Sequence, residues 1–239
     1  MIFLVDIGNT RAKWTKLTNG KLDNISSCEN KLVNHTWLDK HAAQVSRLII
    51  ATVAESAVLE EIKHWAIKNN KACNVIHTEE KAFGVTNGYE HYQQLGVDRW
   101  LAVLGASAIY PKQACVIVDS GSATTIDVLN ENLAHQGGWI LPGLTMIVDS
   151  VVNNTAQVTG ELNYFEELAF GKTTKDNVAL ASWAATKGMI EEAVALSTSH
   201  NVQPKLLITG GNGKALCRLL KHGEYVEDLV FKGLSLYAG

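Results

Sequence analysis

The stretch Asp119-Ser-Gly-Ser-Ala-Thr-Thr-Ile-Asp127 has a near copy at the start of the chain, Asp6-Ile-Gly-Asn-Thr-Arg-Ala-Lys13. Each copy follows an apolar run and places an acid at the strand end, a glycine two residues on, and then small hydroxyl or amide residues. A second strand-like run and a turn containing Asn or Gly come next, and these residues accept positive φ angles cheaply. The sequence therefore predicts two copies of one β-hairpin, each with a polar tip that contains a glycine.

The chemistry of the two tips suits phosphate groups and a hard cation. Glycine lets backbone N–H groups approach phosphate oxygens closely, and Mg²⁺ takes one or two carboxylates while it shares phosphate oxygens. Each tip taken alone is equally compatible with an ordinary hairpin turn and a solvated Asp. The repetition favours a pair of tips that hold the phosphates of a nucleotide from two sides.

Composition argues against several classes of protein. Of the 239 residues, 46% are hydrophobic and 19% are charged, as in globular proteins, and the net charge of −3 with no basic run argues against a nucleic-acid partner. No apolar run approaches the ~20 residues of a membrane span, and the opening residues lack the charged leader of a signal peptide. The cysteines form no Cys-x-x-Cys pair and indicate reduced core residues of a cytoplasmic protein: Cys28, Cys73, Cys115 and Cys217.

The apolar runs predict two halves, residues 1–112 and 113–239, with a shared plan and no linker rich in Pro or Ser. In the first half we expect strands at 2–6, 13–17, 21–26, 48–52 and 74–77, and helices near 37–43 and 58–67. In the second half we expect strands at 115–119, 124–129, 133–140 and 205–209, and helices after Pro142, over 176–199, after 213 and over 229–237. The two halves are expected to pack as one body with a cleft between them.

The motif Gly96-Val-Asp-Arg99 opens a helix that ends near Pro111. An Asp in the first turn complements the helix dipole, so Asp98 is compatible with a purely structural role. A cation at this end of a helix is disfavoured, which leaves Arg99 unexplained. A guanidinium whose planar fork holds a substrate carboxylate would explain it.

Other catalytic patterns do not fit. Thr209-Gly-Gly-Asn-Gly213 occupies the place that Thr52-Val-Ala-Glu-Ser56 holds in the first half, but it lacks the Walker A spacing, and Ala215 stands where Ser or Thr is needed. The second tip does not match Gly-x-Ser-x-Gly, and the eight His residues show no metal-binding spacing. What remains is two acidic tips, one glycine-rich turn and one Asp-Arg helix start, a set that suits phosphoryl transfer from a nucleotide.

The duplicated plan resembles the actin, sugar kinase and heat-shock ATPase superfamily, and the motifs resemble those of type III pantothenate kinases. The resemblance covers the whole chain and implies an α/β fold of two ribonuclease H-like halves, each a mixed five-stranded sheet with helices, around a cleft. The matching motifs occur in the family's order: Asp6-Ile-Gly-Asn-Thr10, Asn87-Gly-Tyr89, Gly96-Val-Asp-Arg99, Asp119-Ser-Gly-Ser-Ala-Thr124, Gly137-Gly-Trp-Ile-Leu-Pro-Gly143 and Thr209-Gly-Gly-Asn212.

The resemblance implies a cytoplasmic homodimer that uses ATP to phosphorylate pantothenate to 4′-phosphopantothenate, the first step of coenzyme A biosynthesis. It implies Mg²⁺ and a monovalent cation, K⁺ or NH4⁺, as cofactors, with Asp6 and Asp119 as the respective metal-site residues. Asp98 is then the general base that accepts the proton of the primary hydroxyl of pantothenate. Thr174 is implied to reach pantothenate from the neighbouring subunit.

Two further sets of residues follow from the same resemblance. Besides Asp98 and Thr174, the pantothenate site is implied to contain Tyr89, Gly96, Val97 and Arg99. The ATP site is implied to contain Asp6, Ile7, Gly8, Asn9, Thr10, Arg11, Ala12, Lys13 and Ser122. The chain departs from the family pattern at Ser122, where Thr is usual, and at Ala181, where Gly is usual.

Two rival functions stay open on the sequence. One is a kinase of the same superfamily that acts on another small hydroxylated acid. The other is a non-catalytic regulatory homologue, which would be expected to have lost Asp6, Asp98 or Asp119. All three acids are present, which favours an enzyme.

Overall fold

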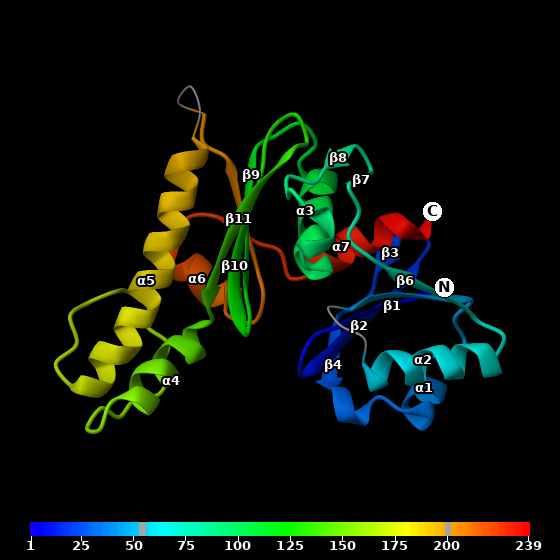
Figure 1. The fold of residues 1–239 in the computed structure, drawn as a ribbon, viewed down its shortest axis with the longest axis horizontal. Coiled ribbons are helices and arrows are strands. Elements are labelled where there is room, and N and C mark those ends of the chain that lie inside the picture. Colours follow the sequence, from blue (N-terminus) through cyan, green and yellow to red (C-terminus); the bar gives the residue numbers. More distant parts are fainter. Residues whose placement is uncertain (53–55, 199–201) are drawn as a thin grey trace. The chain divides into compact units, whose positions relative to one another are not determined.

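The computed structural model describes residues 1–52, 56–198 and 202–239. The chain forms two compact units (Figure 1). Unit 1 comprises Met1–Ala108 together with Asp228–Gly239, and unit 2 comprises Ile109–Glu227. The final helix, α7 (Leu229–Ser235), therefore belongs to unit 1, where it packs on the strands β1 and β5.

Unit 1 is built on a mixed sheet with the strand order β3-β2-β1-β5-β6, and β4 also pairs with β2. β1 is antiparallel to β2 and parallel to β5, which is parallel to β6. A further hairpin, β7 (Lys81–Ala82) and β8 (Val85–Thr86), stands apart from this sheet. The strands of the sheet are β1 (Ile2–Ile7), β2 (Arg11–Thr18), β3 (Lys21–Leu22), β4 (Ser26–Glu29), β5 (Arg47–Thr52) and β6 (Ala72–Ile76).

Both faces of the central strands are covered, which explains the continuous apolar runs. One face of β1 and β5 forms a core with α1 (His35–Ala42) and α2 (Ala57–Lys68), in which Leu38, Ile62 and Trp65 are buried. The other face carries α7. Ser56 caps α2, because its side chain accepts the Leu59 N–H at 3.3 Å.

Unit 2 repeats the plan, with the strand order β11-β10-β9-β12-β13. β9 is antiparallel to β10 and parallel to β12, so the directions match those around β1. Val116, Ile126 and Trp183 lie in the core between this sheet and its helices. The elements are β9 (Cys115–Ser120), β10 (Ala123–Leu129), β11 (His135–Pro142), α4 (Leu144–Asn154), α5 (Thr174–Ser197), β12 (Lys205–Thr209), α6 (Gly213–Leu220) and β13 (Glu224–Tyr225).

The structure corrects two expected elements. The strand expected at 21–26 is two short strands, β3 and β4, that pair with different parts of β2. The helix expected after Pro142 is confirmed: Pro142 ends β11, and Gly143 is the N-cap of α4. The helix expected over 229–237 ends at Ser235 and continues as a 3₁₀ turn, Leu236–Ala238. Within the turn expected at Thr52–Ser56, residues 53–55 lie outside the described part of the chain.

Among the helices that the structure describes, none is both long and apolar enough to cross a lipid bilayer.

Candidate active site

The first hairpin tip lies between β1 and β2. Asp6 pairs with Lys13 and Ile7 with Ala12 in the antiparallel register. Ile7 and Ala12 are buried against α1 and α2, and successive side chains alternate between the faces of a strand, so Asp6 and Lys13 lie on the opposite face. The Gly8 N–H donates to the carbonyl oxygen of Arg11 at 3.0 Å and closes the tip.

Asn30 ties down this tip, and sequence reasoning missed it. Its Nδ2 donates to the carbonyl oxygens of Gly8 at 2.9 Å and Asn9 at 3.2 Å, and its backbone N–H donates to the carbonyl oxygen of Thr10 at 3.0 Å. Three consecutive carbonyl groups are thereby engaged. The tip then presents N–H groups to an incoming anion in preference to carbonyl oxygens, which fits a phosphate group.

The start of α3 (Val97–Ile109) is shaped around the Asp98 carboxylate. Oδ1 of Asp98 accepts the backbone N–H of Arg99 at 2.8 Å, which satisfies one of the free N–H groups of the first turn. A Cβ atom on Gly96 would lie 2.6 Å from that same oxygen. Glycine at position 96 therefore leaves room for the carboxylate, which gives the motif spacing a physical reason.

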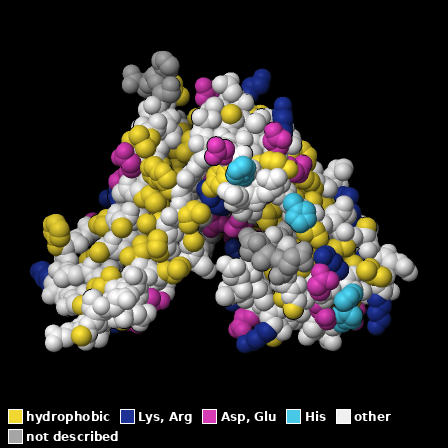
Figure 2. Space-filling model, viewed as in Figure 1, with side chains coloured by type: hydrophobic (Ala, Val, Ile, Leu, Met, Phe, Trp, Pro, Cys, Tyr) yellow, Lys and Arg dark blue, Asp and Glu magenta, His cyan; other side chains and the backbone are white. Residues whose placement is uncertain are grey.

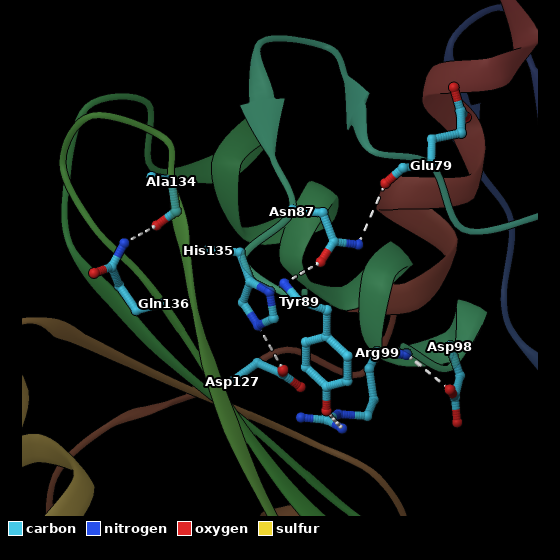
Figure 3. Close-up of polar contacts among 9 residues, drawn as sticks. All are labelled: Glu79, Asn87, Tyr89, Asp98, Arg99, Asp127, Ala134, His135 and Gln136. Carbon is cyan, nitrogen blue, oxygen red and sulfur yellow. Dashed lines mark hydrogen bonds and ion pairs between the residues drawn. The ribbon is translucent and has the colours of Figure 1, made fainter. Parts of the chain in front are cut away.

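Arg99 and Tyr89 are bound to each other beside this helix start (Figure 3). Arg99 is 6% exposed, and its Nη1 donates to the Tyr89 hydroxyl oxygen at 2.7 Å. Its guanidinium carbon lies 5.6 Å from the centre of the Tyr89 ring, a cation–π distance. The Tyr89 N–H donates to Asn87 Oδ1 at 3.0 Å. The structure thus joins Tyr89 to Arg99, next to the sequence neighbours Gly96 and Asp98. That these residues form one binding site stays a prediction.

A cavity of about 440 Å³ adjoins the same helix start. This volume falls in the range of small-molecule pockets, ~300–1,000 Å³. Hydroxyl, amide and imidazole side chains dominate the walls, which suits a small polar ligand. The lining residues are Thr52, His77, Thr78, Gln93, Gln94, Leu95, Gly96 and Val97.

The second hairpin tip, in unit 2, is also closed by its glycine but is one residue shorter than the first. The Gly121 N–H donates to the carbonyl oxygen of Ala123, two positions on, at 2.9 Å, whereas Gly8 bonds Arg11, three positions on. Ser122 is exposed at the end of the tip, and its carbonyl oxygen accepts the Gly143 N–H at 3.1 Å.

The glycine-rich turn after β12 packs directly on the second tip. Thr209 is opposite Asp119 in the parallel register of β12 and β9. Gly210 has φ +86°, and a Cβ atom there would collide with Asp119 Oδ1 and with the carbonyl oxygen of Ser120. The Asn212 N–H donates to that carbonyl oxygen at 3.0 Å. Only glycine combines this positive φ with so close an approach.

Thr174 is exposed at the first turn of α5. The helix is capped by Thr173, whose Oγ1 accepts the Asp176 N–H at 3.1 Å. The contact of Thr174 with a neighbouring subunit's site stays a prediction.

A buried hydrogen-bonded His–Asp pair in unit 2 also escaped sequence reasoning. His135 and Asp127 are joined at 2.8 Å, and their side chains are 0% and 2% exposed. They link β11 to β10 where the register shifts between Asp127 and Leu129 (Figure 3). No local sequence pattern marks such a pair, because it depends on the strand register.

Metal and thiol chemistry are limited. Within residues 1–52, 56–198 and 202–239, no group of three His, Cys, Asp or Glu side chains could hold a metal ion. Mg²⁺ does not need such a cage, because it keeps several waters and binds one or two carboxylates plus phosphate oxygens. Burial raises the pKa of the Cys115 thiol to about 11 and raises the pKa values of Cys28, Cys73 and Cys217. The raised pKa values favour the neutral thiol in all four. Of the expected core cysteines, Cys115 is buried, whereas Cys28, Cys73 and Cys217 are only half-buried.

Two sheets with the same strand order, each with an acidic tip on its first hairpin, define a protein of the sugar kinase and actin-like ATPase fold. Among solved structures, the chain is similar to a putative 2-dehydro-3-deoxygalactonokinase from Sinorhizobium meliloti, with a TM-score of 0.61 at 16% identity over 100% of this chain and 98% of that one. This likeness shows the fold.

The family can also be stated, because the profile of type III pantothenate kinases matches residues 2–196. The chain belongs to that family. It is 37% identical to a type III pantothenate kinase of Colwellia psychrerythraea over the full length of both chains, and 35% identical to one of Pseudoalteromonas translucida over 99% of this chain and 96% of the relative. A structure from Campylobacter jejuni, titled a conserved putative Baf family transcriptional activator, has a TM-score of 0.66 at 25% identity over 99% of this chain and 98% of that one.

Proposed function

We propose that this chain transfers a phosphoryl group from ATP to pantothenate and makes 4′-phosphopantothenate, the first step of coenzyme A biosynthesis. The observation that carries this function is membership of the type III pantothenate kinase family, with relatives of that name aligned over the whole chain. Two contacts of unit 1 support it: the Arg99 side chain donates to the Tyr89 hydroxyl, and the Arg99 backbone N–H donates to the Asp98 carboxylate.

On the acceptor side, Arg99 is assigned to the pantothenate carboxylate and Tyr89 to closing the site beside it. Asp98 is assigned as general base. Its Oδ1 is engaged by the Arg99 N–H, so Oδ2 is the atom assigned to accept the proton of the primary hydroxyl. General bases of this kind contribute roughly 10²–10⁴-fold to the rate. Gly96 and Val97 border the cavity beside them.

On the donor side, the first tip is assigned to the ATP phosphates. Gly8, whose own N–H closes the tip, leaves room for the phosphates, Asn9 and Thr10 offer backbone N–H groups, and Lys13 offers a cation. Mg²⁺, when bound, neutralises charge on the phosphoryl group in transit. Asp6 would hold this ion, and its place on the same face as Lys13 supports the assignment. Ser122 is assigned to ATP and Asp119 to a monovalent cation, K⁺ or NH4⁺. Ile7, Arg11 and Ala12 complete the strand ends that frame the first tip.

We further propose a homodimer that uses unit 2 as its interface. Hydrophobic side chains gather on the surface over α4 and α5 (Figure 2). Met146, Tyr164 and Phe170 are 52%, 65% and 101% exposed, which is costly for large apolar groups on a monomer. A cavity of about 580 Å³ lies beside Phe170 and is lined also by Leu180 and Ala181. Phe170→Glu is expected to shift the mass measured by light scattering from dimer to monomer.

A coupled assay for ADP release tests the proposed activity. The expected result is ADP release that depends on added pantothenate, with 4′-phosphopantothenate identified by mass spectrometry and a parallel series with and without K⁺. A panel of other hydroxylated acids separates pantothenate from rival acceptors. No ADP release with any acceptor would favour the regulatory alternative. The net charge of −3 disfavours nucleic acid as the partner of such a regulator. A cytoplasmic location is part of the same proposal.

A further inference from the structure

We propose that Tyr237 is a positioning residue for the pantothenate site. It hydrogen-bonds Glu79, the first residue of the segment that carries Tyr89, and so fixes the position of that segment. The inference deepens the proposed function and rests on it, because it concerns the segment that places Tyr89 beside Arg99. Tyr237 itself lies on the 3₁₀ turn Leu236–Ala238, far away in sequence.

The 3₁₀ turn Leu236–Ala238 is hydrogen-bonded to the sheet of unit 1 and also contacts the segment that begins at Glu79. Arg47, on β5, donates from Nη2 to the carbonyl oxygen of Ala238 at 2.6 Å. The Tyr237 hydroxyl donates to Glu79 Oε1 at 2.6 Å, a short distance typical of a charge-assisted hydrogen bond. The Tyr237 ring also meets the Phe83 ring edge to face, with centroids 4.9 Å apart and planes at 90°.

A continuous chain of hydrogen bonds leads from Glu79 to Arg99 (Figure 3). The carbonyl oxygen of Glu79 accepts from Asn87 Nδ2 at 3.3 Å. Asn87 Oδ1 accepts the Tyr89 N–H at 3.0 Å, and the Tyr89 hydroxyl accepts from Arg99 at 2.7 Å. Glu79 therefore holds Tyr237 with its side chain and Asn87 with its backbone.

The segment between Glu79 and Tyr89 is a short hairpin, β7 and β8, that pairs within itself and buries little surface. Of its residues, only Val85 and Asn87 are buried, and Phe83 is 49% exposed. A segment with so little buried surface opens locally at small cost in free energy, while the core stays folded. The loss of one anchor is thus expected to loosen the position of Tyr89 without unfolding unit 1.

The Tyr237 hydroxyl stays a hydrogen-bond donor at every pH at which the enzyme would be assayed. Burial, followed by the hydrogen bond to Glu79, raises the pKa of Tyr237 well above its ordinary value, and Trp100 has an opposing effect. The contact to Glu79 therefore does not switch off through ionisation of the phenol between pH 6.5 and 9.

The test is the steady-state kinetics of Tyr237→Phe, which removes the hydroxyl and keeps the ring against Phe83. The expected result is a KM for pantothenate raised roughly three- to tenfold, the effect of one lost hydrogen bond. The KM for ATP and the kcat at saturating pantothenate are expected to stay within about twofold of wild type, and the rise is expected to be the same from pH 6.5 to 9.

Two further sets of variants serve as control and rescue. Tyr110→Phe removes a matched tyrosine–carboxylate hydrogen bond to Glu224 in unit 2 and is expected to leave the KM for pantothenate unchanged. Glu79→Gln keeps an acceptor oxygen for Tyr237, whereas Glu79→Ala removes it. The Gln variant is therefore expected to lie nearer to wild type than the Ala variant, and this pair carries the test if Tyr237→Phe does not fold.

The outcomes separate this inference from the proposed function. If wild type phosphorylates pantothenate but Tyr237→Phe has the wild-type KM and only a lower Tm, Tyr237 is merely structural and the inference is overturned, while the function stands. If wild type does not phosphorylate pantothenate, the function fails and the inference fails with it.

Discussion

Gly96→Ala is expected to slow catalysis by displacing one oxygen atom, Oδ1 of Asp98. The added Cβ atom would lie 2.6 Å from Asp98 Oδ1, whereas ordinary contact begins at 3.4 Å. The carboxylate must therefore retreat by about 0.8 Å. Because Oδ1 also accepts the Arg99 N–H at 2.8 Å, this movement lengthens or breaks that hydrogen bond as well.

The magnitude follows from the geometry of general-base catalysis. A misplacement of ~1 Å at a catalytic group costs about 10²-fold in rate, so kcat for Gly96→Ala is expected to fall by roughly two orders of magnitude. The first hairpin tip, which is assigned to ATP, lies between β1 and β2 and does not include α3. The KM for ATP should therefore stay near that of wild type. The assay is pantothenate-dependent ADP release, with circular dichroism and Tm as checks on folding.

Gly188→Ala is the matched control. Gly188 lies inside α5, and a Cβ atom there would meet no described atom within 4 Å. Replacing glycine by alanine inside a helix stabilises it by roughly 0.5–1 kcal/mol, so this variant should be at least as stable as wild type and retain its kcat. A kcat for Gly96→Ala within twofold of wild type would refute the argument, because the Asp98 carboxylate could then not be held as tightly as the structure indicates.

Three further predictions concern other parts of the account. In calorimetric titrations, Arg99→Ala should weaken the binding of pantothenate far more than the binding of its uncharged alcohol analogue. Equal losses of affinity for the two ligands would speak against a carboxylate contact. Asn30→Leu should raise the KM for ATP by about tenfold through the loss of its hydrogen bonds to the tip, and an unchanged value would remove Asn30 from that role. The folded pKa of Cys115 is raised from 9.0 to about 11, so its burial contributes stability that is fully present below pH 9 and is lost as the pH rises through 11. Urea titrations should show that the free energy of unfolding falls by up to roughly 2–3 kcal/mol more over this pH range in wild type than in Cys115→Ala.

The parts of the fold that could be predicted from sequence rest on local patterns. The two acidic hairpins were visible because an apolar run, an acid and a glycine recur at the same spacing. In the structure the glycine N–H closes each tip, from Gly8 to Arg11 in one and from Gly121 to Ala123 in the other. Arg99 stood out because a cation opposes the dipole at a helix start. The structure joins it to Tyr89.

The parts that could not be predicted depend on residues distant in sequence. Asn30 reaches the first tip from an irregular polar stretch, and Tyr237 reaches Glu79 across 158 positions. The final helix was expected with the second half, but its contacts with β1 and β5 place it in unit 1. Pro142 fits both a helix start and an edge strand, and only the pairing of Pro142 with Ala123 decides between them.

The most direct test of the central claim is a comparison of Asp98→Asn with wild type, in which 4′-phosphopantothenate is quantified by mass spectrometry and ATP binding by calorimetry. Wild type is expected to make the product with ATP. Asp98→Asn is expected to bind ATP with near wild-type affinity but to turn over ~10²–10⁴-fold more slowly. Turnover by Asp98→Asn equal to that of wild type would contradict the central claim.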